Sequence, residues 1–124
     1  AKENLVKINF LGKMNYFELQ EIYKNYRIFI LPSLFEGNPK ALLEALASGC
    51  LVMALSNKNI LEIIVHKENG IIFYPDTDLN NEIKNYLSSE KAFNEITLAG
   101  YDYIKENNLI DLLINEEIKI HQNL

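Results

Sequence analysis

Two carboxylates are the residues of this sequence whose type and spacing could do chemistry. They belong to Glu36 and Glu44, which have seven residues between them. If a helix begins in that interval, Glu44 lies about 7.5 Å along its axis, at about 1.5 Å per residue. A ligand with a central pyrophosphate could then offer one end to Glu36 and a sugar diol at the other end to Glu44. The alternative is an ordinary strand–loop–helix unit in which both glutamates are solvated.

The elements around Glu36 would place a helix N-terminus beside it. A strand-like run over residues 28–31 leads into the loop that carries this glutamate. Asn38 and Pro39 predict the helix start, because asparagine caps helices and proline is tolerated at the first helical position, and Gly49 suits the helix end. The first amides of this helix would point out just beyond a strand, where α/β proteins bind phosphates. These amides belong to Lys40, Ala41 and Leu42.

Four blocks of the sequence, in order, resemble the C-terminal domain of retaining GT-B glycosyltransferases of family 4. They are residues 6–12 (VKINFLG), 29–49 (FILPSLFEGNPKALLEALASG), 51–54 (LVMA) and 68–73 (ENGIIF). The second block contains the Glu-x7-Glu signature of that family. The resemblance covers about residues 6–105, and it implies a Rossmann-like domain that binds a nucleotide-diphosphate sugar.

The resemblance also implies roles for single residues. Glu44 would bind the ribose hydroxyls, and Glu36, the expected catalytic residue, would lie against the donor hexose with the backbone of Gly37 and Asn38. Lys40 either binds phosphate as a point charge or pairs with Glu44 one turn further on. The remaining expected donor-binding residues are Pro39, Ala41 and Leu42 beside the phosphates, and Gly12, Lys13 and Met14 in the loop near the base.

The implied activity is retaining transfer of a hexose from a nucleotide-diphosphate sugar to an acceptor hydroxyl, without a metal or another cofactor. It would serve glycan or cell-envelope polysaccharide biosynthesis. The acceptor, a glycan or a lipid-linked sugar, would be held by an N-terminal domain that this sequence lacks. The alternative is a non-catalytic sugar-nucleotide-binding or protein-interaction module of the same fold.

Residues 1–124 are therefore predicted to form one partial C-terminal domain. In the family, about six parallel strands follow the order 3-2-1-4-5-6, and this sequence begins at the third. The two missing strands would lie between residues 6–11 and residues 28–31, which must pair directly or leave open edges. An open apolar edge invites association, so we expect this piece to be inactive alone, to bind donor weakly, and to form a homodimer or rearrange its sheet.

Short apolar runs separated by helical patterns predict an α/β fold with a parallel sheet. The predicted strands cover residues 6–11, 28–31, 51–55 and 70–73, and the predicted helices between them cover residues 16–25, 39–48 and 60–66. Three C-terminal helices are predicted after Phe73. The first runs from Leu79 to Leu87, the second from Phe93 to Ile104 with Gly100 as a weak point, and the third from Leu109 to His121.

Composition restricts the setting in which the chain works. A formal net charge of −5 and a pI near 5.0 argue against nucleic acid as the main partner. The single cysteine, Cys50, cannot form an internal disulfide and is expected to be a buried structural thiol in a reducing compartment. No apolar run reaches the length of a membrane span. A cytoplasmic protein is expected, with peripheral contact of the full enzyme with the inner face of the membrane left open.

Three other features have ordinary structural explanations. Asp76-Thr77-Asp78 matches the Asp-x-Asp metal motif of the GT-A fold, but it precedes a helical pattern and is expected to cap that helix. His66 and His121 have no second ligand at metal spacing and are expected on the surface. The aromatic residues of the first half are expected to pack in the core and not to stack on bases; they are Tyr23, Tyr26 and Phe29.

Overall fold

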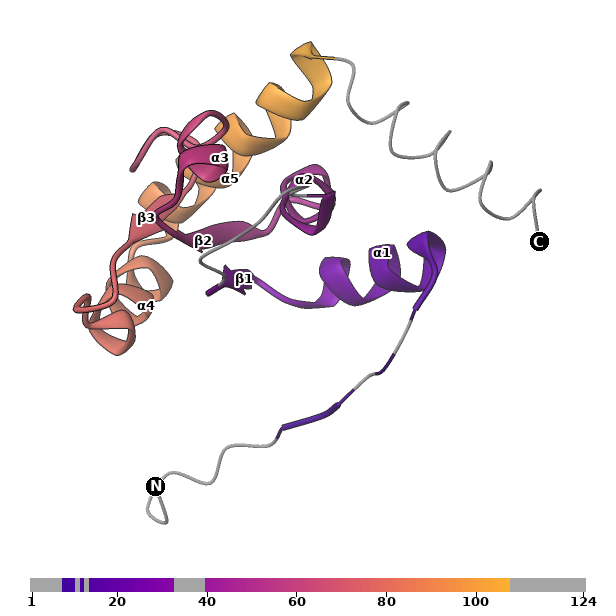
Figure 1. Cartoon of the computed structure of the whole chain (residues 1–124), viewed down its shortest axis with the longest axis horizontal. Coiled ribbons are helices and arrows are strands. Elements are labelled where there is room, and N and C mark those ends of the chain that lie inside the picture. The colour runs from indigo at the N-terminus through magenta and orange to yellow at the C-terminus, as the bar shows by residue number, and fades with distance from the viewer. Residues whose placement is uncertain (1–7, 11, 13, 33–39, 108–124) are drawn as a thin grey trace.

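A computed structural model of the chain describes residues 8–10, 12, 14–32 and 40–107. Within these residues, three parallel strands form one sheet in the order β1-β2-β3, and helices alternate with them (Figure 1). This Rossmann-like α/β arrangement confirms the predicted fold class. The elements are α1 (Tyr16–Asn25), β1 (Ile28–Leu31), α2 (Lys40–Ala47), β2 (Leu51–Leu55), α3 (Lys58–Leu61), β3 (Ile71–Phe73), α4 (Leu79–Ser88) and α5 (Glu90–Glu106).

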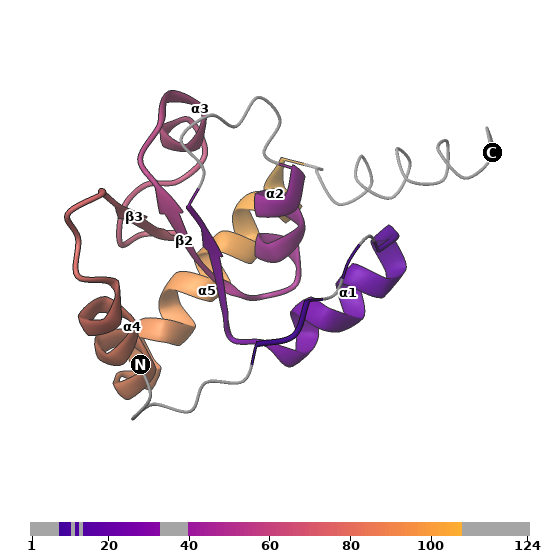
Figure 2. The same cartoon turned by 60° about the horizontal axis from the view of Figure 1, so that its bottom comes forward.

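The central strand β2 contributes to two cores, one on each face of the sheet, because successive side chains of a strand point to opposite sides. Every residue of β2 is buried. Val52 and Ala54 pack in a core that contains residues of α1, α2 and α3 and the C-terminal part of α5. Leu51, Met53 and Leu55 pack in a second core with α4 and the N-terminal half of α5. Figure 2 shows the sheet lying between α2 and α4, with α5 crossing behind it.

Gly49 ends α2 as the sequence predicts. Its φ is +82°, a left-handed conformation that costs glycine little. The Gly49 amide donates to the Leu46 carbonyl, and the Cys50 amide donates to the Ala45 carbonyl, each over 3.1 Å. These two bonds form a Schellman motif, which satisfies the last carbonyls of the helix and turns the chain directly into β2.

The strand predicted over residues 6–11 does not form where the structure describes that segment. Residues 8–10 have no regular secondary structure, and the side chain of Phe10 is 95% exposed. A strand requires a hydrogen-bonded neighbour, and β1 pairs only with β2 among the described residues. The alternative in which this segment pairs directly with β1 is therefore wrong for residues 8–10, and the second edge of β1 has no described partner.

The helix predicted over residues 60–66 is also wrong in its extent. Asn57 accepts a hydrogen bond from the Ile60 amide over 3.0 Å, so α3 starts at Lys58, two residues before the predicted start. The helix ends at Leu61, five residues before the predicted end. Beyond it, the Asn69 side chain accepts from the Val65 amide over 2.8 Å and donates to a second carbonyl of this turn, that of residue 63, over 3.0 Å. Side-chain bonds thus replace the helical bonds that the apolar spacing suggested.

Gly100 does not weaken the second C-terminal helix, since α5 continues unbroken through it. A Cβ atom at this position would lie 2.8 Å from Leu46 Cδ2 and 3.0 Å from the Asn69 carbonyl oxygen. The glycine therefore lets α5 pack closely against α2 and the turn before β3. The third predicted helix, residues 109–121, lies outside the described residues. None of the helices in the described part of the chain has the length and apolar character needed to cross a membrane.

Candidate functional site

The candidate site begins at the N-terminus of α2, at the end of the sheet where the parallel strands finish. The chain passes from β1 through residues 33–39 to Lys40, the first residue of α2. The expected phosphate-binding amides lie in this first turn and belong to Lys40, Ala41 and Leu42. Amides of a first helical turn have no acceptor within the helix itself, and they point toward the positive end of the helix dipole.

Part of the predicted site lies outside the described residues. These positions are Glu36, Gly37, Asn38, Pro39 and Lys13, and their expected roles remain predictions. The structure does describe Gly12 and Met14, just before the Asn15 side chain, which caps α1 by accepting from the Glu18 amide over 2.9 Å. Gly12 is exposed with a φ of +70°, so the expected base-binding loop turns there.

Glu44 is the buried charged residue of the described chain. Its side chain is 4% exposed, and Glu44 Oε1 lies 3.8 Å from Lys40 Nζ, one turn earlier on α2. By contrast, the side chain of Glu21 in the exposed Lys24–Glu21 pair of α1 is 73% exposed. The interpretation of Glu44 as a solvated glutamate is therefore wrong. The Lys40–Glu44 ion pair, one of the two alternatives for Lys40, is present, at a distance longer than a hydrogen bond.

Helix α1 packs in the same core as α2, near Glu44. Tyr23 of α1 is buried, and its ring makes an edge-to-face contact with Phe29, with 5.8 Å between the ring centroids. Burial, then the Glu44 carboxylate and the Cys50 thiol, raise the pKa of Tyr23 to about 12. The phenol is therefore neutral at physiological pH and lies close enough to Glu44 to respond to its charge.

Two residues near Glu44 were not predicted from the sequence. Ser48 Oγ lies 3.0 Å from Gln20 Oε1 of α1 and donates to the Glu44 carbonyl over 2.9 Å. These bonds join α1 to the end of α2. The sequence carries no signal for this contact, because the two residues are 28 positions apart and each is an ordinary polar residue in or directly after a helix.

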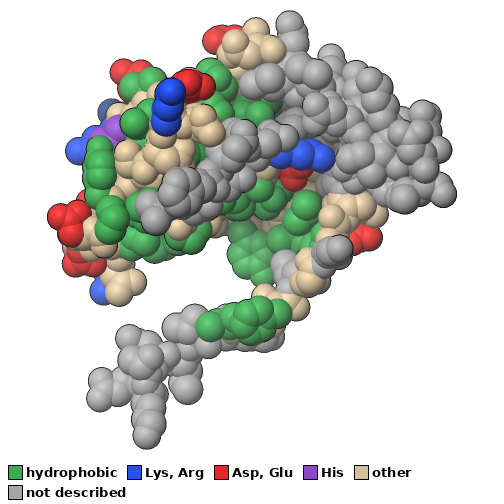
Figure 3. Space-filling view, viewed as in Figure 1, with side chains coloured by type: hydrophobic (Ala, Val, Ile, Leu, Met, Phe, Trp, Pro, Cys, Tyr) green, Lys and Arg blue, Asp and Glu red, His purple; other side chains and the backbone are tan. Residues whose placement is uncertain are grey.

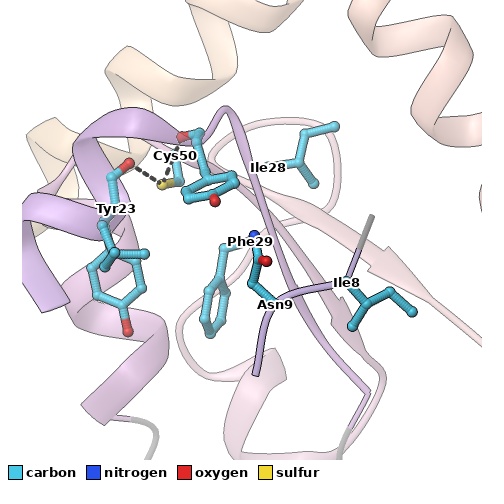
Figure 4. Close-up of a pocket in the computed structure, with 8 residues that line it drawn as sticks. Ile8, Asn9, Tyr23, Ile28, Phe29 and Cys50 are labelled. Atoms are coloured by element: carbon cyan, nitrogen blue, oxygen red, sulfur yellow. Dashed lines mark hydrogen bonds between the residues drawn. The ribbon is translucent and has the colours of Figure 1, made fainter. Parts of the chain in front are cut away.

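The opposite end of the sheet holds an apolar pocket of about 370 Å³, beside the start of β1 (Figure 4). Its walls include Ile22, Tyr26 and Phe29, with Cys50 at the start of β2. Cys50 Sγ lies 3.3 Å from the Tyr23 carbonyl oxygen and 3.4 Å from the Tyr26 carbonyl oxygen, so that its single S–H can donate to either, and burial raises the pKa of the thiol. These contacts confirm a buried structural thiol. In Figure 3, hydrophobic side chains reach the surface in the middle of the view.

The aromatic predictions hold in part. Tyr23 and Phe29 pack against the core, whereas the Tyr26 side chain is exposed at the end of α1, so its prediction as a core residue is wrong. Asp78 caps α4 by accepting from the Asn81 amide over 3.2 Å, which confirms the expected cap. Among the described residues, no cluster of three or more His, Cys, Asp or Glu residues could hold a metal.

His66 is exposed, as predicted, and also has a structural role. Its Nδ1 accepts a hydrogen bond from the Ile72 amide of β3 over 3.0 Å. Asn57 is the N-cap of α3, just after the end of β2. His121 lies outside the described residues.

Comparisons with known proteins agree with this geometry. A model of the family described as glycosyl transferases group 1 matches residues 1–103. An uncharacterized glycosyltransferase of Methanocaldococcus jannaschii is 39% identical over 69 residues, which is 56% of this chain. An uncharacterized glycosyltransferase of Haemophilus influenzae is 32% identical over 66 residues, or 52% of this chain. The matched stretch spans only 18% of the length of each relative.

A solved structure extends the similarity to the fold. It is the crystal structure of the C-terminal domain of a glycosyl transferase group 1 family protein (LpcC) from Francisella tularensis. The two superpose with a TM-score of 0.68 at 31% sequence identity, over 80% of this chain and 51% of that domain structure. The described sheet and helices thus correspond to about half of such a C-terminal domain.

Proposed function

The chain belongs to the glycosyl transferase group 1 family, and from this premise we propose that it binds the nucleotide-sugar donor of a retaining, family 4-like GT-B enzyme. The whole enzyme would transfer a hexose from a nucleotide-diphosphate sugar to an acceptor hydroxyl. The acceptor, a glycan or lipid-linked sugar in polysaccharide biosynthesis, would be held by a domain outside this chain. The burial of Glu44 one turn into α2 is the observation that carries the proposal.

A buried carboxylate needs compensation, because removing a charge from water costs several kcal/mol unless it is paired and hydrogen-bonded. Lys40 supplies an opposite charge at 3.8 Å. We assign the ribose hydroxyls of the donor to Glu44, because a diol presents two hydrogen-bond donors to one carboxylate.

The first turn of α2 would bind the donor diphosphate. Its amides lie at the positive end of the helix dipole, which favours a phosphate group. The Lys40 ammonium, about one-quarter exposed, could contact both this diphosphate and Glu44. Helix-end amides also suit the leaving diphosphate, whose negative charge grows as the glycosidic bond breaks.

The remaining roles are assigned by position in the motif. Glu36, with Gly37, Asn38 and Pro39, would face the donor hexose and favour the positively charged sugar of the transition state. Gly12, Lys13 and Met14 would form the loop near the base. No metal or other cofactor is assigned to these steps, and a cytoplasmic location, with or without peripheral membrane contact, is part of the same proposal.

Saturation-transfer NMR on the 124-residue chain tests donor binding directly. UDP- and GDP-sugars should receive magnetisation at their ribose and base protons, and the panel would identify the preferred nucleotide. A free hexose should receive none. A chain that binds no nucleoside diphosphate at all contradicts the proposal, whereas binding without transfer in the whole protein would favour the non-catalytic module.

The edge of β1 that has no partner among the described residues supports the proposal of a homodimer. Ile30 in the middle of this strand is partly exposed, and Ile8 and Tyr26 expose apolar surface close by. Two copies could pair along this edge, since edge strands template association. Light scattering across a concentration series should detect the dimer, and a monomer at the highest concentration contradicts it.

A further inference from the structure

The contact between α1 and α2 includes two polar residues, Gln20 and Ser48, to which the proposed function gives no task. We infer that both are positioning residues that hold α1 against Glu44 and so keep this carboxylate in its donor-binding place. The inference rests on the proposed function, because it concerns the residue that would bind the ribose.

Ser48 lies one turn after Glu44, directly beyond the end of α2. Its amide donates to the Glu44 carbonyl over 3.1 Å, and its Oγ lies 2.9 Å from the same carbonyl oxygen. A serine that bonds only to the carbonyl four residues earlier is ordinary at a helix end. Here Oγ is also 3.0 Å from Gln20 Oε1, on a different helix and 28 residues away in the sequence.

The hydrogen count favours one direction for this contact. A serine hydroxyl has one hydrogen and cannot donate to two acceptors at once. Gln20 Nε2 is buried and has no hydrogen-bond partner among the described residues. Turning the Gln20 amide by 180° places Nε2 against Ser48 Oγ, since the amide oxygen and nitrogen are interchangeable in shape. Gln20 then donates to Ser48, and Ser48 donates to the Glu44 carbonyl.

This relay matters because α1 provides part of the wall around Glu44. Tyr23 lies three residues after Gln20 on α1, and the Glu44 charge contributes to the raised pKa of its phenol. Residues three apart share one face of a helix. Glu44 and Ser48 are four residues apart and so share one face at the end of α2, and Ser48 Oγ lies 3.0 Å from Gln20. The face of α1 that carries Gln20 and Tyr23 therefore lies beside the face that carries Glu44, and the relay fixes how closely the two faces approach. Without it, α1 would keep its apolar contacts but lose the bond that sets its register against α2.

The test measures nucleoside diphosphate affinity and stability together. Ligand-detected NMR titration of the 124-residue chain with UDP and with GDP gives the dissociation constants, and urea unfolding gives the stability of each variant. Ser48→Ala and Gln20→Met should each weaken binding about threefold to tenfold, the effect of one lost hydrogen bond. Ser48→Thr keeps the hydroxyl and should restore wild-type affinity.

Ser88→Ala is the matched control. Ser88 Oγ donates to the Asn85 carbonyl over 3.0 Å at the exposed end of α4, with no second helix involved. Its substitution should leave affinity unchanged. The inference is wrong if Ser48→Ala and Gln20→Met lower stability but bind like wild type, or if Ser48→Thr binds as weakly as Ser48→Ala.

Glu44→Ala separates this inference from the proposed function. If Glu44→Ala weakens binding while Ser48→Ala and Gln20→Met do not, the ribose role stands and the positioning role fails. If Glu44→Ala binds like wild type, or the wild-type chain binds neither nucleotide, the proposed function fails and the positioning role fails with it.

Discussion

Polar side chains have different partners at the two ends of the sheet. At the amino ends of the strands, they form hydrogen bonds with the backbone. The single S–H of the buried Cys50 thiol can donate to the Tyr23 or the Tyr26 carbonyl, and the partly buried Asn69 side chain bonds twice to the turn before β3. Towards the carboxyl ends, α2 buries a formal charge, Glu44, whose ion pair to Lys40 spans 3.8 Å.

This difference distinguishes polar groups that stabilise the fold from a charged group that is suited to bind a ligand. A thiol or an amide that bonds to backbone carbonyls contributes to stability and needs no ligand. A carboxylate is costly to remove from water, and buried ionisable residues are typical of functional sites. The exposed Lys24–Glu21 pair of α1 shows what the same two residue types do without burial, since such surface pairs contribute at most about 1 kcal/mol.

The largest expected effect lies at the carboxyl end, at Glu36. In the whole transferase, Glu36→Gln should lower kcat about a hundredfold, because its interaction with the sugar would develop mainly in the transition state. Nucleoside diphosphate affinity should barely change. Glu68→Gln, in the exposed turn at the amino end of β3, is the matched control and should keep wild-type turnover. Equal kcat losses in both variants would remove the functional distinction between the two ends.

At the amino end, the expected effects concern stability. Gly100→Ala would place a Cβ 2.8 Å from the buried Leu46 side chain and 3.0 Å from the Asn69 carbonyl. Overpacking of about 1–3 kcal/mol should outweigh the gain of about 1 kcal/mol in helix propensity, so urea unfolding should shift to lower urea. Glu95→Ala on the exposed side of α5 should change stability little. A Gly100→Ala variant more stable than wild type would contradict this packing.

Tyr23 contacts both regions, and its titration should connect them. Its pKa is raised in the folded state from 10.0 to about 12, so the folded chain holds this proton more tightly than the unfolded chain. The stabilisation is fully present below pH 10 and is lost as the pH rises toward 12. Urea unfolding between these values should show that decline, and Tyr23→Phe should reduce its slope. An equal slope in both proteins would contradict a coupled, buried phenol.

The smallest expected effect is at the cap of α4. Asp78→Ala should cost about 1 kcal/mol of stability, because it removes the acceptor for the Asn81 amide. Asp76→Ala, two residues earlier, should cost less. Sugar transfer by the whole enzyme should survive EDTA and both substitutions. Loss of transfer in EDTA together with loss in Asp76→Ala would show that these aspartates hold a metal.

Elements decided by local chemistry were predictable from the sequence. The apolar runs of β1 and β2, the bounds of α1 and the glycine end of α2 are as predicted, since each depends on residues within a few positions. The Asp78 cap is predictable for the same reason. The burial of Glu44 could not be derived from its spacing, because it depends on how α2 packs against α1, which lies more than 18 residues earlier in the chain.

Elements decided by distant contacts were mispredicted. Residues 8–10 have the composition of a strand but no described neighbour to pair with. The run after α3 has helical spacing, but the Asn69 side chain takes its backbone bonds. Gly100 suggests a break in α5, but the close approach of Leu46 explains its presence. Gln20 and Ser48 escaped notice because their bond becomes apparent only when α1 and α2 lie side by side.

The central claim is that burial makes Glu44 a ligand for the donor, whereas Glu21 is a surface residue. Titration of UDP and GDP into Glu44→Ala and Glu21→Ala tests it most directly, because each variant removes one carboxylate that pairs with a lysine on its own helix. Glu44→Ala should weaken nucleotide binding at least about tenfold, as expected from the loss of charged hydrogen bonds. Glu21→Ala should bind like wild type. Equal dissociation constants for the two variants would contradict the assignment.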